Sequence, residues 1–105
     1  MNIDDRFLEM ITRFVKENKD KLFDLKPGEV VEKVMENIRK HGLAAKFFIR
    51  MNWSKIESVF QNPEQILESL KNYDKETYEI VIKHIDWFKE FLNILHNELR
   101  VFIEK

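Results

Sequence analysis

Hydrophobic residues in the last third of the chain recur at alternating intervals of three and four positions. The register is unbroken over eight residues: Tyr78, Val81, Ile85, Phe88, Leu92, Leu95, Leu99 and Phe102. This spacing places one side chain per turn on the same face of an α-helix. With Asp74 as its N-cap, the pattern predicts a single helix from about residue 74 to residue 105.

A second apolar row widens the buried face of this predicted helix. It consists of Ile80, Trp87, Ile94 and Val101. The combined arc covers about 160–200° of the circumference, which is too broad for a two-stranded coiled coil. The helix would be roughly 46 Å long, more than any other helix expected in this chain. We therefore expect either that shorter helices cover it in series or that another protein covers part of it.

The preceding residues predict shorter helices separated by glycine, proline and capping residues. The first begins at Asn2 or Asp4 and ends near Lys21, and the second has Pro27 in its first turn and ends before Gly42. Three more helices are expected near residues 43–51, 54–61 and 63–72. The sequence thus predicts an all-α fold, a five- or six-helix bundle packed around a long C-terminal helix (about 74–105), with residues 1–105 in a single domain.

Two details of the central helices bear on packing. Leu43, Phe47 and Met51 repeat every four residues, and the neighbouring alanines allow close contact with another helix. Ser54 and Glu57 have the spacing of a capping box, which predicts the start of the next short helix at Ser54.

Composition supports a helical protein in a reducing compartment. Apolar residues make up 44% of the chain, glycine and proline together number four, and cysteine is absent. The longest stretch without a charged residue is seven positions, far shorter than a membrane span. We expect a cytoplasmic protein with no membrane partner.

The sequence contains no recognisable catalytic or ligand-binding motif. His84 and His96 lie on opposite flanks of the predicted long helix, and no histidine has a second ligand at metal-binding spacing. Gly28 and Gly42 are isolated, so a glycine-rich phosphate loop is excluded. We predict that the protein is not an enzyme and binds no metal or cofactor, and the sequence identifies no small-molecule substrate.

The central region is basic within an otherwise acidic chain. Residues 33–55 carry a net charge of +5, whereas residues 1–32 carry −2 and residues 56–105 carry −4. The order of helix, glycine turn and helix in this region also resembles the outline of a helix-turn-helix, with the helix after Ser54 in the reading position. The candidate nucleic-acid contacts are Lys33, Arg39, Lys40, Lys46, Arg50 and Lys55.

The functional prediction is a small helical module for protein–protein interaction, either a homo-oligomer or a subunit of a larger complex. The candidate interface lies along the long C-terminal helix and comprises Phe88, Phe91, Leu92, Leu95, Leu99 and Phe102. The alternative is a nucleic-acid-associated regulator or helix-turn-helix DNA-binding protein that uses the basic region.

Overall fold

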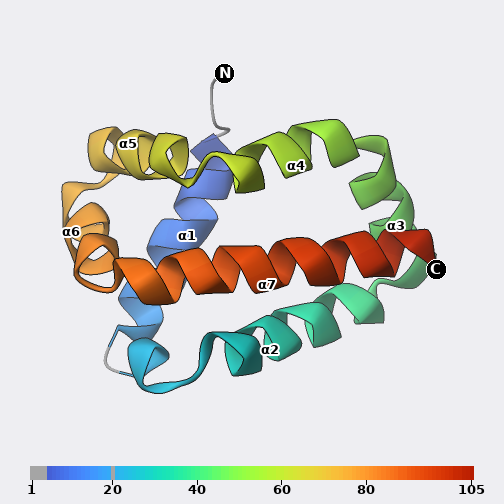
Figure 1. Ribbon diagram of the computed structural model, residues 1–105, viewed down its shortest axis with the longest axis horizontal. Coiled ribbons are helices and arrows are strands. Elements are labelled where there is room, and N and C mark those ends of the chain that lie inside the picture. Colours follow the sequence, from blue (N-terminus) through green and yellow to red (C-terminus); the bar gives the residue numbers. More distant parts are fainter. Residues whose placement is uncertain (1–4, 20) are drawn as a thin grey trace.

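A computed structural model of the protein describes residues 5–19 and 21–105, and over these residues the fold is all α-helical (Figure 1). The predicted start of the first helix, at Asn2 or Asp4, lies outside the described residues. The elements are α1 (Asp5–Asn18), a short 3-10 helix η1 (Leu22–Asp24), α2 (Pro27–Lys40), α3 (Gly42–Met51), α4 (Trp53–Gln61), α5 (Pro63–Tyr73), α6 (Lys75–Lys83) and α7 (Ile85–Glu104).

The predicted all-α bundle packed around a long C-terminal helix is confirmed, but the helix expected at about residues 74–105 breaks at His84 into α6 and α7, so the described residues form seven α-helices instead of five or six. His84 leaves the helical conformation, with φ −122° and ψ 41°. Its ring stacks on Phe23 of η1 at 3.9 Å between centroids, and one turn later the Trp87 indole donates a hydrogen bond to the Leu25 carbonyl at 2.8 Å. Because of this break, α6 changes direction and packs against α1 and α5, and α7 continues as a separate helix.

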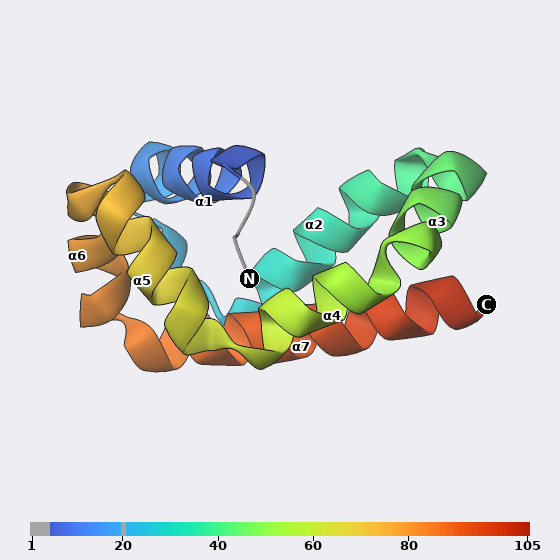
Figure 2. The same cartoon turned by 90° about the horizontal axis from the view of Figure 1, so that it is seen from above.

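The core forms two clusters that are arranged along α7. The first joins α1, η1, the start of α2, α5, α6 and the beginning of α7, with Ile66, Leu70 and Val81 completely buried. The second joins α2, α3, α4 and the end of α7, and Met35 is its most deeply buried residue. Half-buried Phe60 and Phe91 pack against both clusters and make the core continuous. Figure 2 shows the two groups of helices at opposite ends of the molecule.

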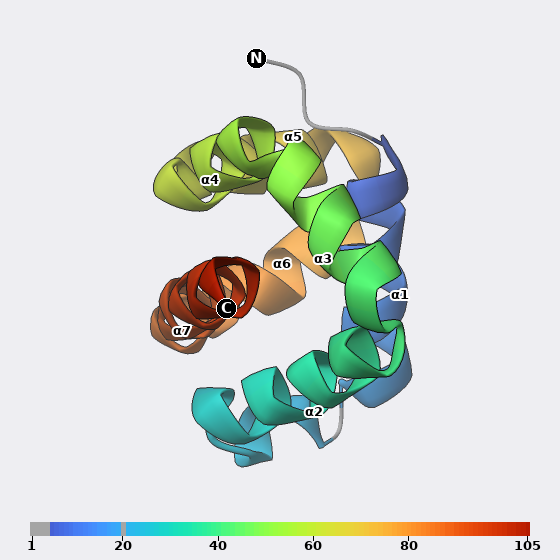
Figure 3. The same cartoon turned by 90° about the vertical axis from the view of Figure 1, so that its right-hand side faces the viewer.

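The shorter helices cover α7 in series, one of the two arrangements expected from its length. Among these contacts, the packing of α2 on α7 is the most extensive, and α3 and α4 add contacts beyond it. In Figure 3, where α7 is viewed nearly end-on, α2, α3 and α4 form an arc around it.

Several predicted helix boundaries are confirmed. Pro27 and Pro63 stand in the first turns of α2 and α5, and Gly42 adopts a left-handed φ of +55° between α2 and α3. The Ser54 capping box is wrong, because α4 begins at Trp53 and the Glu57 carboxylate instead contacts His96 Nε2 at 3.1 Å.

Asp74 caps α6 as predicted and also joins that helix to α1. Its carboxylate accepts a hydrogen bond from the Thr77 amide at 3.3 Å and contacts Lys16 Nζ at 2.7 Å. The hydrogen bond from Lys16 is the main reason that the pKa of Asp74 lies below its ordinary value of 3.8.

We expect Asp74→Ala to lower the free energy of unfolding by about 1 kcal/mol, the usual cost of losing an N-cap. The deficit relative to the wild type should be complete above pH 3.8 and should disappear as the pH falls through the lowered pKa of the folded state. Urea unfolding from about pH 6 to about pH 2.5 measures both effects. Glu79→Ala, which removes an exposed carboxylate from the same helix, is the control, and an equal loss in both variants would contradict the capping role.

Candidate functional site

The helix α3 can be described as four rows of residues spaced four apart. One row holds Leu43, Phe47 and Met51, and the next holds Ala44 and Phe48. The large side chains of these two rows are the most exposed such group in the described chain: Leu43 is 70% exposed, Phe47 55%, Phe48 67% and Met51 83%. We call these four residues the α3 face.

The remaining rows of α3 fix the helix to the body. Ala45 is half-buried, and Ile49, 8% exposed, belongs to the second core cluster together with Leu99 and Ile103 of α7. In the neighbouring row, the Arg50 guanidinium donates a hydrogen bond to the Ile103 carbonyl near the end of α7. The helix therefore presents its exposed residues from an anchored backbone.

The α3 face is large for a protein of this size. Four side chains of this type, each more than half exposed, present on the order of 500 Å² of apolar surface, comparable to the largest patch on a typical monomer. The helix lies at one end of the molecule, away from α1, α5 and α6 (Figure 2). Contiguous patches of this size often mark interaction sites.

The surroundings of the α3 face are exclusively cationic in sequence. Residues 37–56 contain five lysines and arginines and neither aspartate nor glutamate. Lys46 and Arg50 form the row directly beside Leu43 and Phe47, so positive charge borders one flank of the face. On the other flank, the row of Phe48 adjoins the buried row of Ile49.

The structure separates the six predicted nucleic-acid contacts into distinct environments. Arg39 pairs with Glu32 at 3.1 Å, and Arg50 is bound to the Ile103 carbonyl. Lys40, Lys46 and Lys55 form no ion pair with any residue that the structure describes. Lys33 lies on α2, beside the cleft described below.

The helix predicted to read DNA, α4, is packed into the fold along much of its length. It is nine residues long and contacts α3, α5 and α7. His96 of α7 stacks on Phe60 at 5.6 Å between centroids, while its ring nitrogen contacts Glu57. These contacts hold Glu57 against α7, and Lys55 and Gln61 remain exposed.

The predicted interface along α7 is covered by other helices of the same chain. Phe88, Leu92 and Leu99 are 5–6% exposed, and Phe91, Leu95 and Phe102 are half-buried against the two core clusters. The exposed apolar residues lie instead on α3, where the repeat of Leu43, Phe47 and Met51 suggested packing. The sequence signal that could have identified these exposed residues is that three of the four rows of α3 are apolar.

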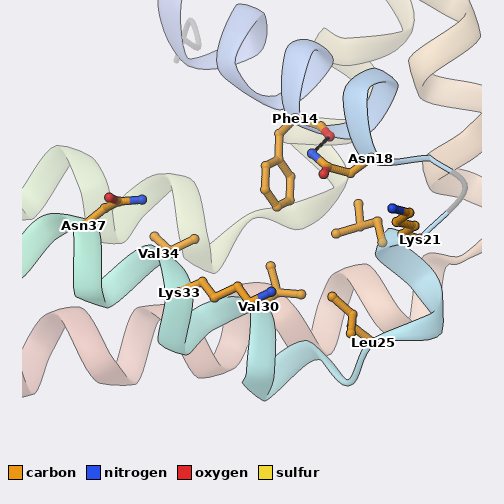
Figure 4. Close-up of a pocket in the computed structure, with 9 residues that line it drawn as sticks. Phe14, Asn18, Lys21, Leu25, Val30, Lys33, Val34 and Asn37 are labelled. Atoms are coloured by element: carbon orange, nitrogen blue, oxygen red, sulfur yellow. Dashed lines mark hydrogen bonds between the residues drawn. The ribbon is translucent and has the colours of Figure 1, made fainter.

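A small cleft lies between α1, η1 and α2 (Figure 4). Phe14, Leu25, Val30 and Val34 line its apolar part, and Lys21 and Lys33 stand at its edges. Its volume of about 140 Å³ is well below the roughly 300–1,000 Å³ of pockets that enclose drug-sized ligands. The cleft therefore does not fit such a ligand.

Within residues 5–19 and 21–105, the chain contains no group of three or more histidine, aspartate or glutamate side chains placed to hold a metal ion. Nor does any helix within these ranges combine the length and apolarity needed to cross a bilayer.

No protein-family model matches the chain, and no curated protein or solved structure matches it either. The geometry and charge of the α3 face are therefore the features of the molecule that bear on its function.

Truncating a side chain should affect the free energy of unfolding differently on the two sides of α3. Phe48→Ala should change the free energy of unfolding by no more than about 0.5 kcal/mol, because Phe48 is mostly exposed. Ile49→Ala, at the adjacent position, should cost about 2–5 kcal/mol because it opens a cavity in the second core cluster. Urea unfolding of both variants makes the comparison, and a loss of several kcal/mol for Phe48→Ala would show that its ring is buried.

Proposed function

We propose that this protein is a small helical interaction module that binds a second protein through the α3 face. The observation that carries the proposal is the exposure of Leu43, Phe47, Phe48 and Met51 on a helix whose other side is anchored in the core. Covering these side chains removes apolar surface from water, which is the main favourable term in most protein associations.

The anchoring of α3 favours binding because the face is already formed. Ile49 and the hydrogen bond from Arg50 to the Ile103 carbonyl hold the helix in place before any partner arrives. Less conformational entropy is then lost on association. A patch on the order of 500 Å² is smaller than the roughly 800 Å² that each partner buries in a standard interface, so we expect a moderate, reversible affinity unless adjoining surfaces contribute.

Nucleic-acid binding is the second candidate, and the lack of carboxylates over residues 37–56 is the observation in its favour. Lys40, Lys46 and Lys55 are available for phosphate contacts. It ranks second because the most exposed side chains beside these lysines are apolar. A phosphate-dominated complex would weaken steeply with salt, whereas burial of the α3 face would be much less salt-dependent.

We expect Phe47→Glu to abolish capture of a specific partner by the affinity-tagged protein in its native host. Placing a carboxylate at the centre of an apolar contact imposes a desolvation cost of several kcal/mol on the complex but not on the free protein. Quantitative mass spectrometry compares the captured proteins, and calorimetry with the purified partner confirms direct binding.

Met10→Glu is the matched control for this experiment, because Met10 is 67% exposed on α1, outside the α3 face. The partner should bind this variant as it binds the wild type. A partner that is retained by Phe47→Glu and lost with Met10→Glu would place the binding surface elsewhere and contradict the proposal.

A further inference from the structure

We infer that the segment covering the α3 face is an acidic amphipathic helix of another protein. This inference rests on the proposed function and adds the chemistry of the partner. It follows from the arrangement of rows on α3 and from the charge beside them.

The shape of the α3 face is suited to packing against a helix of a partner. Leu43, Phe47 and Met51 form one ridge, and Phe48 projects from the parallel row in which Ala44 is small. Two neighbouring ridges, each made of residues spaced four apart, leave a groove between them. Helices in globular proteins most often pack by placing a ridge of the same kind into such a groove. The ten residues of α3 span about 15 Å, which corresponds to nearly three turns of a partner helix.

Charge complementarity identifies the flank of that partner helix as acidic. Lys46 and Arg50 are one turn apart in the row beside Leu43 and Phe47. Carboxylates spaced four apart along a helix would lie opposite this row. The α3 segment itself supplies none, because residues 37–56 contain no aspartate or glutamate.

The same charges disfavour a second copy of this chain. A symmetric dimer through the α3 face would bring Lys46 and Arg50 of each protomer towards a surface whose residues 37–56 carry only positive charge. Like charges brought together across an interface oppose association.

A lipid surface fits the arrangement of charges less well. Helices that lie in a membrane interface present lysine and arginine across the face opposite their apolar side chains. On α3 the cations occupy one flank only, and the row of Ile49 is buried in the protein. A partner with a single acidic row matches this asymmetry.

The test uses two synthetic, helix-stabilised peptides with identical apolar rows, one carrying glutamate and the other lysine on a single flank. Fluorescence anisotropy measures their binding to the full-length protein. The glutamate peptide should bind at least tenfold more tightly at low salt, and Lys46→Glu should remove this preference. Lys83→Glu, which reverses an exposed charge on α6, should leave it unchanged, and Phe47→Glu should abolish binding of both peptides.

Other results would overturn the inference in distinguishable ways. Equal binding of the two peptides, abolished by Phe47→Glu, would refute the acidic partner and leave the docking face intact. Binding of both peptides that is unaffected by Phe47→Glu would contradict the docking face as well. No binding of the glutamate peptide up to millimolar concentration would refute the acidic helix, and the capture experiment would still decide the proposed function.

Two parallel measurements examine the competing occupants. The first is sedimentation with phosphatidylcholine vesicles that contain phosphatidylserine. If the wild type sediments with them, Phe47→Glu does not, and neither peptide is preferred, the α3 face binds a lipid surface. A concentration-dependent dimer mass that Phe47→Glu returns to monomer would assign it to a second copy. Either result would overturn the acidic helix.

Discussion

The packing of short helices along α7 determines how the other elements of the fold are arranged. This helix has twenty residues and carries apolar side chains around much of its circumference, so no single shorter helix in the chain can cover it. The chain meets this requirement with two core clusters in series, joined by Phe60 and Phe91. The break at His84 also limits the length of helix that must be covered, because α6 packs against α1 and α5 instead of extending α7.

The α3 face exists because this arrangement buries only a small part of α3. Ile49 is the only buried residue of the helix, and the hydrogen bond from Arg50 completes its attachment to the end of α7. Leu43, Phe47, Phe48 and Met51 are therefore not required by the fold, and their exposure calls for an explanation outside it. The proposed docking of a partner supplies that explanation. The cationic row beside the face gives the partner its expected acidic character.

Local signals predicted much of the fold. Pro27, Gly42, Pro63 and Asp74 mark helix boundaries because each acts through its own backbone or side-chain chemistry, which does not depend on distant residues. The break at His84 was missed because two successive helices can keep the same apolar spacing. It is accompanied by contacts with Phe23 and by the hydrogen bond between Trp87 and Leu25, 62 positions apart. The exposure of the α3 face was missed for a similar reason: apolar periodicity on α3 does not reveal which rows the other helices reach.

Cysteine labelling measures directly whether one side of α3 is solvent-accessible in the folded protein. The chain contains no cysteine, so a single Phe48→Cys or Ile49→Cys substitution gives an unambiguous site. The thiol at position 48 should react with a maleimide reagent at nearly the rate of a free peptide, independently of protein concentration, while the thiol at position 49 should react only as the protein opens. Strong protection of position 48 in the isolated protein, or equal rates at the two positions, would show that this side of α3 is not exposed.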